Sequence, residues 1–146
     1  MNAVTQKLPG VARVALGLIF LVFGLNGFFH FLPAPPPPAS ALGFVGGLAS
    51  APYFFPLLKG TEVVAGVLLL SNRFVPLALT LLAPIIVNIA AFHLFLAPSP
   101  GMVVALLAAE IYLAWSYRAA FRGVLAAHAK PAPVAPSGRT IEAAAE

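Results

Sequence analysis

The chain contains no cysteine, and only 8% of its 146 residues carry a charge. The lack of cysteine excludes intramolecular disulfides, thiolate metal ligands and a thiol relay carried by the chain itself. The scarcity of charge, together with 61% hydrophobic residues, is far from the composition of a soluble globular domain. This composition predicts an integral membrane protein without a soluble catalytic domain, in which redox chemistry would need a bound cofactor.

Four long apolar stretches make up most of the sequence. At 1.5 Å per helical residue, roughly 20 apolar residues cross the hydrocarbon core of a bilayer. The sequence therefore predicts an all-α polytopic membrane protein, a four-helix transmembrane bundle with spans at about 9–32, 53–71, 74–96 and 101–122. A cleaved signal peptide is a less favoured alternative, because the first apolar run is about 22 residues and long enough to span.

The connection between the first two spans has an unusual composition. Prolines occupy five of the six positions 33–38, which predicts a stiff polyproline-like spacer outside the membrane. Residues 39–52 stay apolar but contain three glycines and are too short to span. A short interfacial or re-entrant segment is expected there, and a lid over the mouth of the bundle is a second interpretation.

The eight Lys and Arg residues are unevenly distributed around the predicted spans. Seven of them lie on one side of the bundle if the N-terminus is cytoplasmic, and only Lys59 lies near the other side. Because Lys and Arg near span ends are retained in the cytoplasm, the pattern predicts N-in, C-in topology. Residues 1–8 are then a cytoplasmic N-terminus, 9–128 the membrane domain and 129–146 a disordered cytoplasmic tail. The net charge of +4 reflects this topology, and no nucleic-acid partner is expected.

Strongly polar side chains are rare within the spans, and the five main ones come from all four of them: Asn26, His30, Glu62, Asn88 and Glu110. Polar groups in hydrocarbon are costly unless they face protein or water, so such a set marks a candidate functional site. Counting helical residues from the outer connections places all five in the outer half of the membrane. His93 lies in the same half, but about 140° around its helix from Asn88, so one narrow site cannot readily use both. If Asn88 points inward, His93 is expected to face an interface or the headgroups.

The two carboxylates have different surroundings. Lys59 precedes Glu62 by three residues, so an intrahelical ion pair and a position lining a cavity are both open interpretations for Glu62. Glu110 has no cation near it on its own helix, which makes it the stronger candidate for a proton donor or carrier. A role for Glu110 in packing or folding specificity is the alternative.

Asn26, His30 and Asn88 can also serve the structure of their helices without contacting a ligand. Asn26 and His30 share a helix face at a spacing of four, where a hydrogen bond between their side chains is the simplest structural role. Asn88 follows Pro84 by four residues, so a role beside the kink expected at that proline competes with ligand contact.

Two classes of ligand fit such a set of residues. Two His and two Glu could bind a metal, but no pair of them has ligand spacing within a span, and no metal is predicted. A quinone or another flat apolar molecule suits better, because it needs an apolar cleft, a few hydrogen-bonding groups and nearby aromatic rings. In this interpretation Glu62 and Glu110 are the catalytic proton donors or acceptors, and Asn26, His30 and Asn88 orient the bound ring.

Several segments of the sequence form a family pattern. The first span contains Arg13-Val14-Ala15-Leu16-Gly17-Leu18-Ile19-Phe20 followed by Gly24, the second contains Glu62 with Gly66-Val67-Leu68-Leu69-Leu70, and the third contains Pro76 and ends near His93. In these segments the chain resembles the DoxX-like family of small four-span bacterial membrane proteins, over about 11–122. The resemblance implies that Glu62 is the family's second-span acidic residue. Relatives that use cysteine pairs differ from this chain, which has none.

The resemblance also implies a bacterial cytoplasmic (inner) membrane location and, as in some members, a place as a subunit of thiosulfate:quinone oxidoreductase or another membrane redox complex. The expected function is a membrane subunit of a redox or respiratory assembly, with a protein partner or a second copy of the chain, and without a self-contained catalytic motif. One alternative is a noncatalytic scaffold in which Gly17 and Gly24 pack a partner. Another is a small-molecule or proton pathway, although the cytoplasmic half offers almost no ionisable residue.

Overall fold

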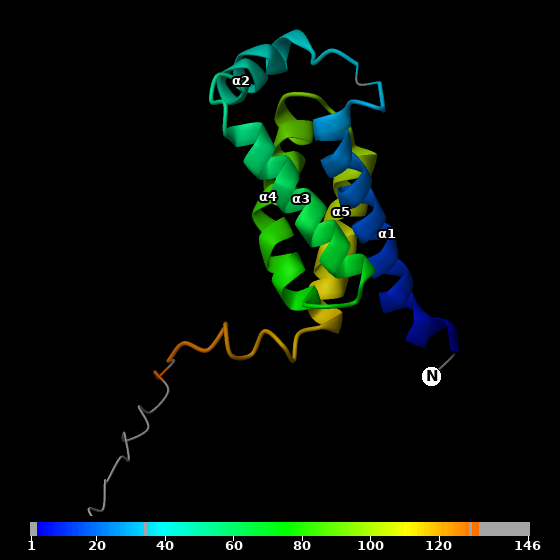
Figure 1. The fold of residues 1–146 in the computed structure, drawn as a ribbon. Coiled ribbons are helices and arrows are strands. Elements are labelled where there is room, and N and C mark those ends of the chain that lie inside the picture. The colour runs from blue at the N-terminus through cyan, green and yellow to red at the C-terminus, as the bar shows by residue number, and fades with distance from the viewer. Residues whose placement is uncertain (1–2, 34, 129, 132–146) are drawn as a thin grey trace, which may run out of the picture.

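The computed structural model describes residues 3–33, 35–128 and 130–131, and the regular structure within them is entirely α-helical. Helices α1, α3, α4 and α5 run side by side, and α2 lies across one end of this bundle (Figure 1). The helices span Ala3–Phe29 (α1), Ala39–Ala49 (α2), Phe54–Leu70 (α3), Val75–Phe95 (α4) and Pro100–Ser116 (α5). The predicted all-α class is confirmed for these residues.

Two helices are long and apolar enough to cross a membrane, Lys7–Phe29 within α1 and Val75–Phe95. Helices α2 and α3 are bent by 92° at a short break and count as a third span if they are taken as one. Helix α5 is apolar as well but has only 17 residues. The described residues therefore hold two to three candidate membrane spans, the make-up of a polytopic membrane protein.

The ends of α3 and α4 lie within a residue of the predicted spans, whereas α1 begins six residues before the predicted start at 9. Pro9 lies inside this helix. As the seventh residue of α1, it lies beyond the first turn and removes one helical hydrogen bond. The loss of this single bond does not prevent the helix from extending back to Ala3.

The predicted fourth span is too long, because α5 ends at Ser116 and not near 122. Residues after Ser116 form consecutive turns. The carbonyl of Trp115 accepts a bond from the guanidinium of Arg118 at 2.9 Å and another from the Arg118 backbone N–H at 3.2 Å. This carbonyl would otherwise pair with the N–H four residues later, so the side chain of Arg118 competes with continuation of the helix.

Glycines bring α1 and α3 into close contact. A Cβ atom at Gly17 would lie 3.0 Å from Cβ of Leu69, and one at Gly66 would lie 2.7 Å from the backbone nitrogen of Leu21. A Cβ at Gly24 would lie 2.9 Å from Cγ2 of Val63. The predicted small-residue seam therefore exists, but α3 of the same chain covers it. The interpretation that Gly17 and Gly24 pack a partner is corrected by these contacts.

Arg13, on α1, binds the C-terminal end of α3. Its guanidinium donates hydrogen bonds to the carbonyls of Leu69 and Leu70, the latter at 3.3 Å. The last carbonyls of a helix have no helical partner and carry partial negative charge. A guanidinium from a neighbouring helix supplies both the hydrogen bonds and the compensating positive charge. Arg13 thereby holds the C-terminus of α3 against α1. Beside it lies a buried core that includes Phe20 and the fully buried Leu16, Leu69, Leu79, Leu82, Ile86 and Leu113.

Helix α2 confirms the short helix expected in 39–52. The extended backbone of Pro38, with φ −61° and ψ 157°, leads into it as the polyproline-like spacer requires. The hydroxyl of Ser40 donates to the carbonyl of Leu96 at 2.6 Å, and the ring of Phe44 lies 6.0 Å from that of Phe92. These contacts fasten α2 to the end of α4. The tail predicted over 129–146 falls outside the described residues, apart from 130–131.

We expect Gly66→Ala to destabilise the protein by about 1–3 kcal/mol, because the added Cβ meets the backbone of α1, which cannot rotate away. The measurement is the free energy of unfolding by denaturant titration in a mild detergent. Gly60→Ala is the matched control on α3, since a Cβ there meets nothing within 4 Å. Equal stability of the two variants would contradict the close approach of α1 and α3.

Candidate functional site

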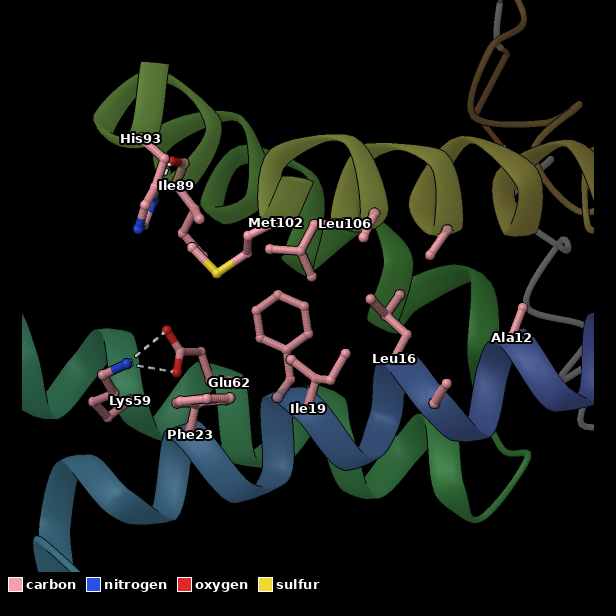
Figure 2. A pocket seen from close by; sticks show the side chains of 14 residues that line it. Ala12, Leu16, Ile19, Phe23, Lys59, Glu62, Ile89, His93, Met102 and Leu106 are labelled. Carbon is pink, nitrogen blue, oxygen red and sulfur yellow. Dashed lines mark hydrogen bonds and ion pairs between the residues drawn. The ribbon is translucent and has the colours of Figure 1, made fainter. Parts of the chain in front are cut away.

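A cavity of about 570 Å³ lies between α1 and α5. Its walls are apolar over most of their area and include Leu16, Phe20 and Phe23 from α1 and Met102, Leu106 and Ala109 from α5. Figure 2 shows the two helices on opposite sides of the space, with the side chains of Leu16, Met102 and Leu106 directed into it. The volume falls in the range of roughly 300–1,000 Å³ that is typical of small-molecule sites.

The cavity opens sideways. Three of its lining residues, Ile19, Phe23 and Met102, have exposed fractions of 41%, 53% and 40%, so they belong to the outer surface as well as to the cavity wall. The opening therefore lies along the sides of α1 and α5, where these exposed residues are apolar.

One end of the cavity is polar. The ammonium of Lys59 lies 2.8 Å from Oε2 and 3.1 Å from Oε1 of Glu62, and both residues line the cavity. Glu62 is only 3% exposed, whereas the side chain of Lys59 is 24% exposed. Figure 2 shows the pair at the end of α3 nearest His93. Both interpretations of Glu62 therefore hold together, since it pairs with Lys59 and lines the cavity.

His93 reaches this polar end from α4. Its Nδ1 lies 2.9 Å from the carbonyl oxygen of Ile89. A carbonyl can only accept a hydrogen bond, so Nδ1 carries the proton and Nε2 of a neutral ring is an acceptor. Both Ile89 and His93 line the cavity, and Figure 2 shows the imidazole extending from α4 toward Lys59 and Glu62.

Two glycines of α1 leave room for the ion pair. A Cβ at Gly27 would lie 2.6 Å from Cδ of Lys59, and a Cβ at Gly24 would lie 3.1 Å from Cβ of Glu62. The aliphatic stem of Lys59 thus lies directly on the backbone of α1. The glycine seam therefore positions the Lys59–Glu62 pair as well as the two helices.

The structure places Asn26 and His30 outside the cavity lining. The side-chain oxygen of Asn26 accepts the backbone N–H of Leu32 at 2.6 Å, which holds the chain as it leaves α1. His30 is exposed and has a positive φ of 51°, and its backbone N–H donates to the carbonyl of Asn26 at 2.9 Å. Asn26 therefore serves the end of α1 through Leu32, in place of the expected bond with His30.

Asn88 is exposed on α4 and does not line the cavity, whereas His93 does. The angular argument that one site cannot use both residues agrees with this arrangement, but the inward member is His93 and not Asn88. The signal available in the sequence was spacing: His93 continues, at helical intervals, a stripe formed by the buried Leu82 and Ile86 and the half-buried Ile89. Helix α4 is apolar on all sides, so its sequence alone does not identify that stripe as the inner one.

Glu110 is buried behind the cavity wall. It is 8% exposed, and its Oε2 has no hydrogen-bond partner within the described structure. Its neighbours Leu106 and Ala109 line the cavity, while Glu110 itself does not. Glu62 therefore lines the cavity and Glu110 does not, although the sequence interpretation gave both a proton-transfer role.

Among the residues that the structure describes, no group of three or more His, Asp or Glu side chains could hold a metal ion. Comparison with protein-family models, with curated proteins and with solved structures found no match to this chain. The resemblance to the DoxX-like family therefore stays a prediction from the residues of the first three spans.

Removal of one partner should affect stability more for Lys59 than for Glu62. Lys59→Met leaves a buried carboxylate uncompensated and should cost about 3–5 kcal/mol, the range for breaking a buried pair. Glu62→Gln leaves a lysine that already reaches solvent and should cost about 1 kcal/mol or less. Denaturant titrations of both variants and of the double variant measure these differences. The double variant should recover most of the loss, and equal costs for the two single variants would contradict the burial of Glu62.

Proposed function

We propose that the protein is a membrane subunit of a redox or respiratory assembly in the bacterial cytoplasmic membrane, and that it binds a quinone between α1 and α5. The observation that carries this proposal is the apolar cavity, open at its side and ending at Lys59, Glu62 and His93. A quinone has an apolar ring and tail with hydrogen-bonding oxygens at the ring edge, and it diffuses within the hydrocarbon. Its shape and its route of entry both match this cavity.

In this proposal α1, α3, α4 and α5 are four spans with N-in, C-in topology. Helices α3 and α5 have 17 residues each, about 26 Å at 1.5 Å per residue, and such short spans are accommodated by local thinning of the bilayer. Helix α2, at 92° to α3, lies along the outer interface. The polar end of the cavity is then in the outer half of the membrane, and Arg73 and Arg118 are at the cytoplasmic ends of their helices.

The polar groups have distinct parts in holding the ring. The ammonium of Lys59 has three N–H donors, of which Glu62 takes two, and the third is directed to a ring carbonyl. Nε2 of His93 accepts a hydrogen bond from the ring hydroxyl of the reduced form. Glu62 keeps Lys59 in place and is a proton acceptor at the same end. Asn26, His30 and Asn88 have no part in this arrangement, and electron transfer belongs to the partner protein of the assembly.

Binding of a decyl-substituted benzoquinone to the purified chain in lipid nanodiscs tests the proposal. Titration calorimetry should show saturable binding, and His93→Ala and Lys59→Met should each weaken it about tenfold, the effect of losing one hydrogen bond to a polar group. Ala105→Phe should abolish binding, because Ala105 lines the cavity and a phenyl ring would fill its mouth.

Asn88→Ala and His30→Ala are the matched controls, since both residues are exposed and outside the cavity lining. They should bind the quinone as the unmodified chain does. Absence of saturable binding, or equal binding by Ala105→Phe and the unmodified chain, would overturn the proposal. A stoichiometric protein that copurifies with a chain unable to bind quinone would favour the scaffold alternative.

A further inference from the structure

The charges at the polar end of the cavity cancel within the protein itself. Both carboxylate oxygens of Glu62 lie within hydrogen-bond distance of the Lys59 ammonium, at 3.1 and 2.8 Å. The third polar group, His93, contributes an uncharged acceptor when its ring is neutral and its Nδ1 proton is engaged by Ile89. A ligand head that reaches this end therefore meets one donor and two acceptors with no net charge.

We infer that Glu62 is a charge filter, which makes the cavity select lipophilic molecules with a neutral head and reject anionic amphiphiles such as fatty acids. The inference rests on the proposed function, because it takes the cavity as a ligand site, and it names the residue that sets its selectivity. An apolar slot with a lysine at one end is otherwise well suited to an alkyl carboxylate. Glu62 occupies the position that the ligand's carboxylate would take beside Lys59.

The packing around Glu62 keeps its carboxylate beside the ammonium of Lys59. Glu62 is 3% exposed, and its Cβ lies 3.1 Å from the Cβ position of Gly24, so the backbone of α1 packs against the base of the side chain. The stem of Lys59 is held in the same way over Gly27. An incoming anion would thus stand beside a fixed carboxylate of like charge in surroundings of low dielectric constant, where repulsion is strong. A neutral carbonyl or hydroxyl meets no such penalty.

Two ligands with the same tail test the filter on the unmodified chain. In nanodiscs, oleyl alcohol should bind at least tenfold more tightly than oleate, as measured by calorimetric titration of each ligand separately. Equal or tighter binding of oleate would overturn the inference. This comparison needs no substitution and so does not depend on the folding of a variant.

Glu62→Gln should reverse the preference, because it leaves Lys59 unneutralised at the end of the slot. Oleate should gain at least tenfold in affinity relative to oleyl alcohol, whose uncharged head is not attracted to the free ammonium of Lys59. Glu110→Gln is the matched control, a buried carboxyl outside the cavity lining, and should leave both affinities unchanged. Adding Lys59→Met to Glu62→Gln should remove the gain.

The outcomes separate the inference from the proposal on which it rests. A chain that binds benzoquinone, but whose Glu62→Gln variant does not gain affinity for oleate, contradicts the filter and leaves quinone binding intact. A chain that binds oleyl alcohol and not benzoquinone, with the reversal present, supports the filter and contradicts the quinone. Binding of none of the three molecules overturns both.

Discussion

The close approach of the α1 and α3 backbones is the constraint on which the rest of the structure depends. Gly17 and Gly24 on one helix and Gly66 on the other leave no space for a Cβ, and Arg13 closes the pair at the end of α3. Without a hydrophobic driving force between helices in lipid, such packing and hydrogen bonding are what hold two spans together. The glycine face of α1 packs against α3. A different face of α1 therefore forms the cavity wall, with Leu16, Phe20 and Phe23.

The same contact explains how a charged pair is kept inside an apolar bundle. Buried ion pairs contribute little to stability, since desolvation offsets the attraction between the charges. Lys59 and Glu62 are nevertheless set in place by neighbouring glycines, with the lysine stem against Gly27 and the base of the carboxylate against Gly24. An apolar pair of similar volume would pack there at less cost in desolvation. Under the proposed function, the charges are therefore better explained by the ligand of the cavity than by the stability of the helices.

The apolar runs and prolines were enough to predict α3 and α4 to within a residue, because hydrophobic length and proline are local signals. The end of α5 was not predictable in this way, because it depends on the guanidinium of Arg118 taking the carbonyl of Trp115. The site was predicted in part: Glu62 and its partner Lys59 follow from their spacing on one helix. Which of His93 and Asn88 faces inward was left open, because a helix that is apolar over most of its surface does not reveal which face is buried. Likewise the glycine spacing indicated a close-packing seam but not that α3 itself would cover it.

The position of α2 bears on how a ligand reaches the polar end. Ser40 and Phe44 fasten α2 to Leu96 and Phe92 at the end of α4, and Phe92 packs edge-on against His93 at 5.1 Å between ring centroids. Helix α2 thus covers the end of the bundle beside His93 (Figure 1), whereas the side between α1 and α5 is open at Ile19, Phe23 and Met102. A water-soluble molecule approaching that end meets α2 first, while a lipid-dissolved one meets an apolar opening. Under the proposed function, this arrangement favours lateral exchange with the bilayer, which suits a neutral lipophile that partitions deeply better than an amphiphile held at the surface by its charge.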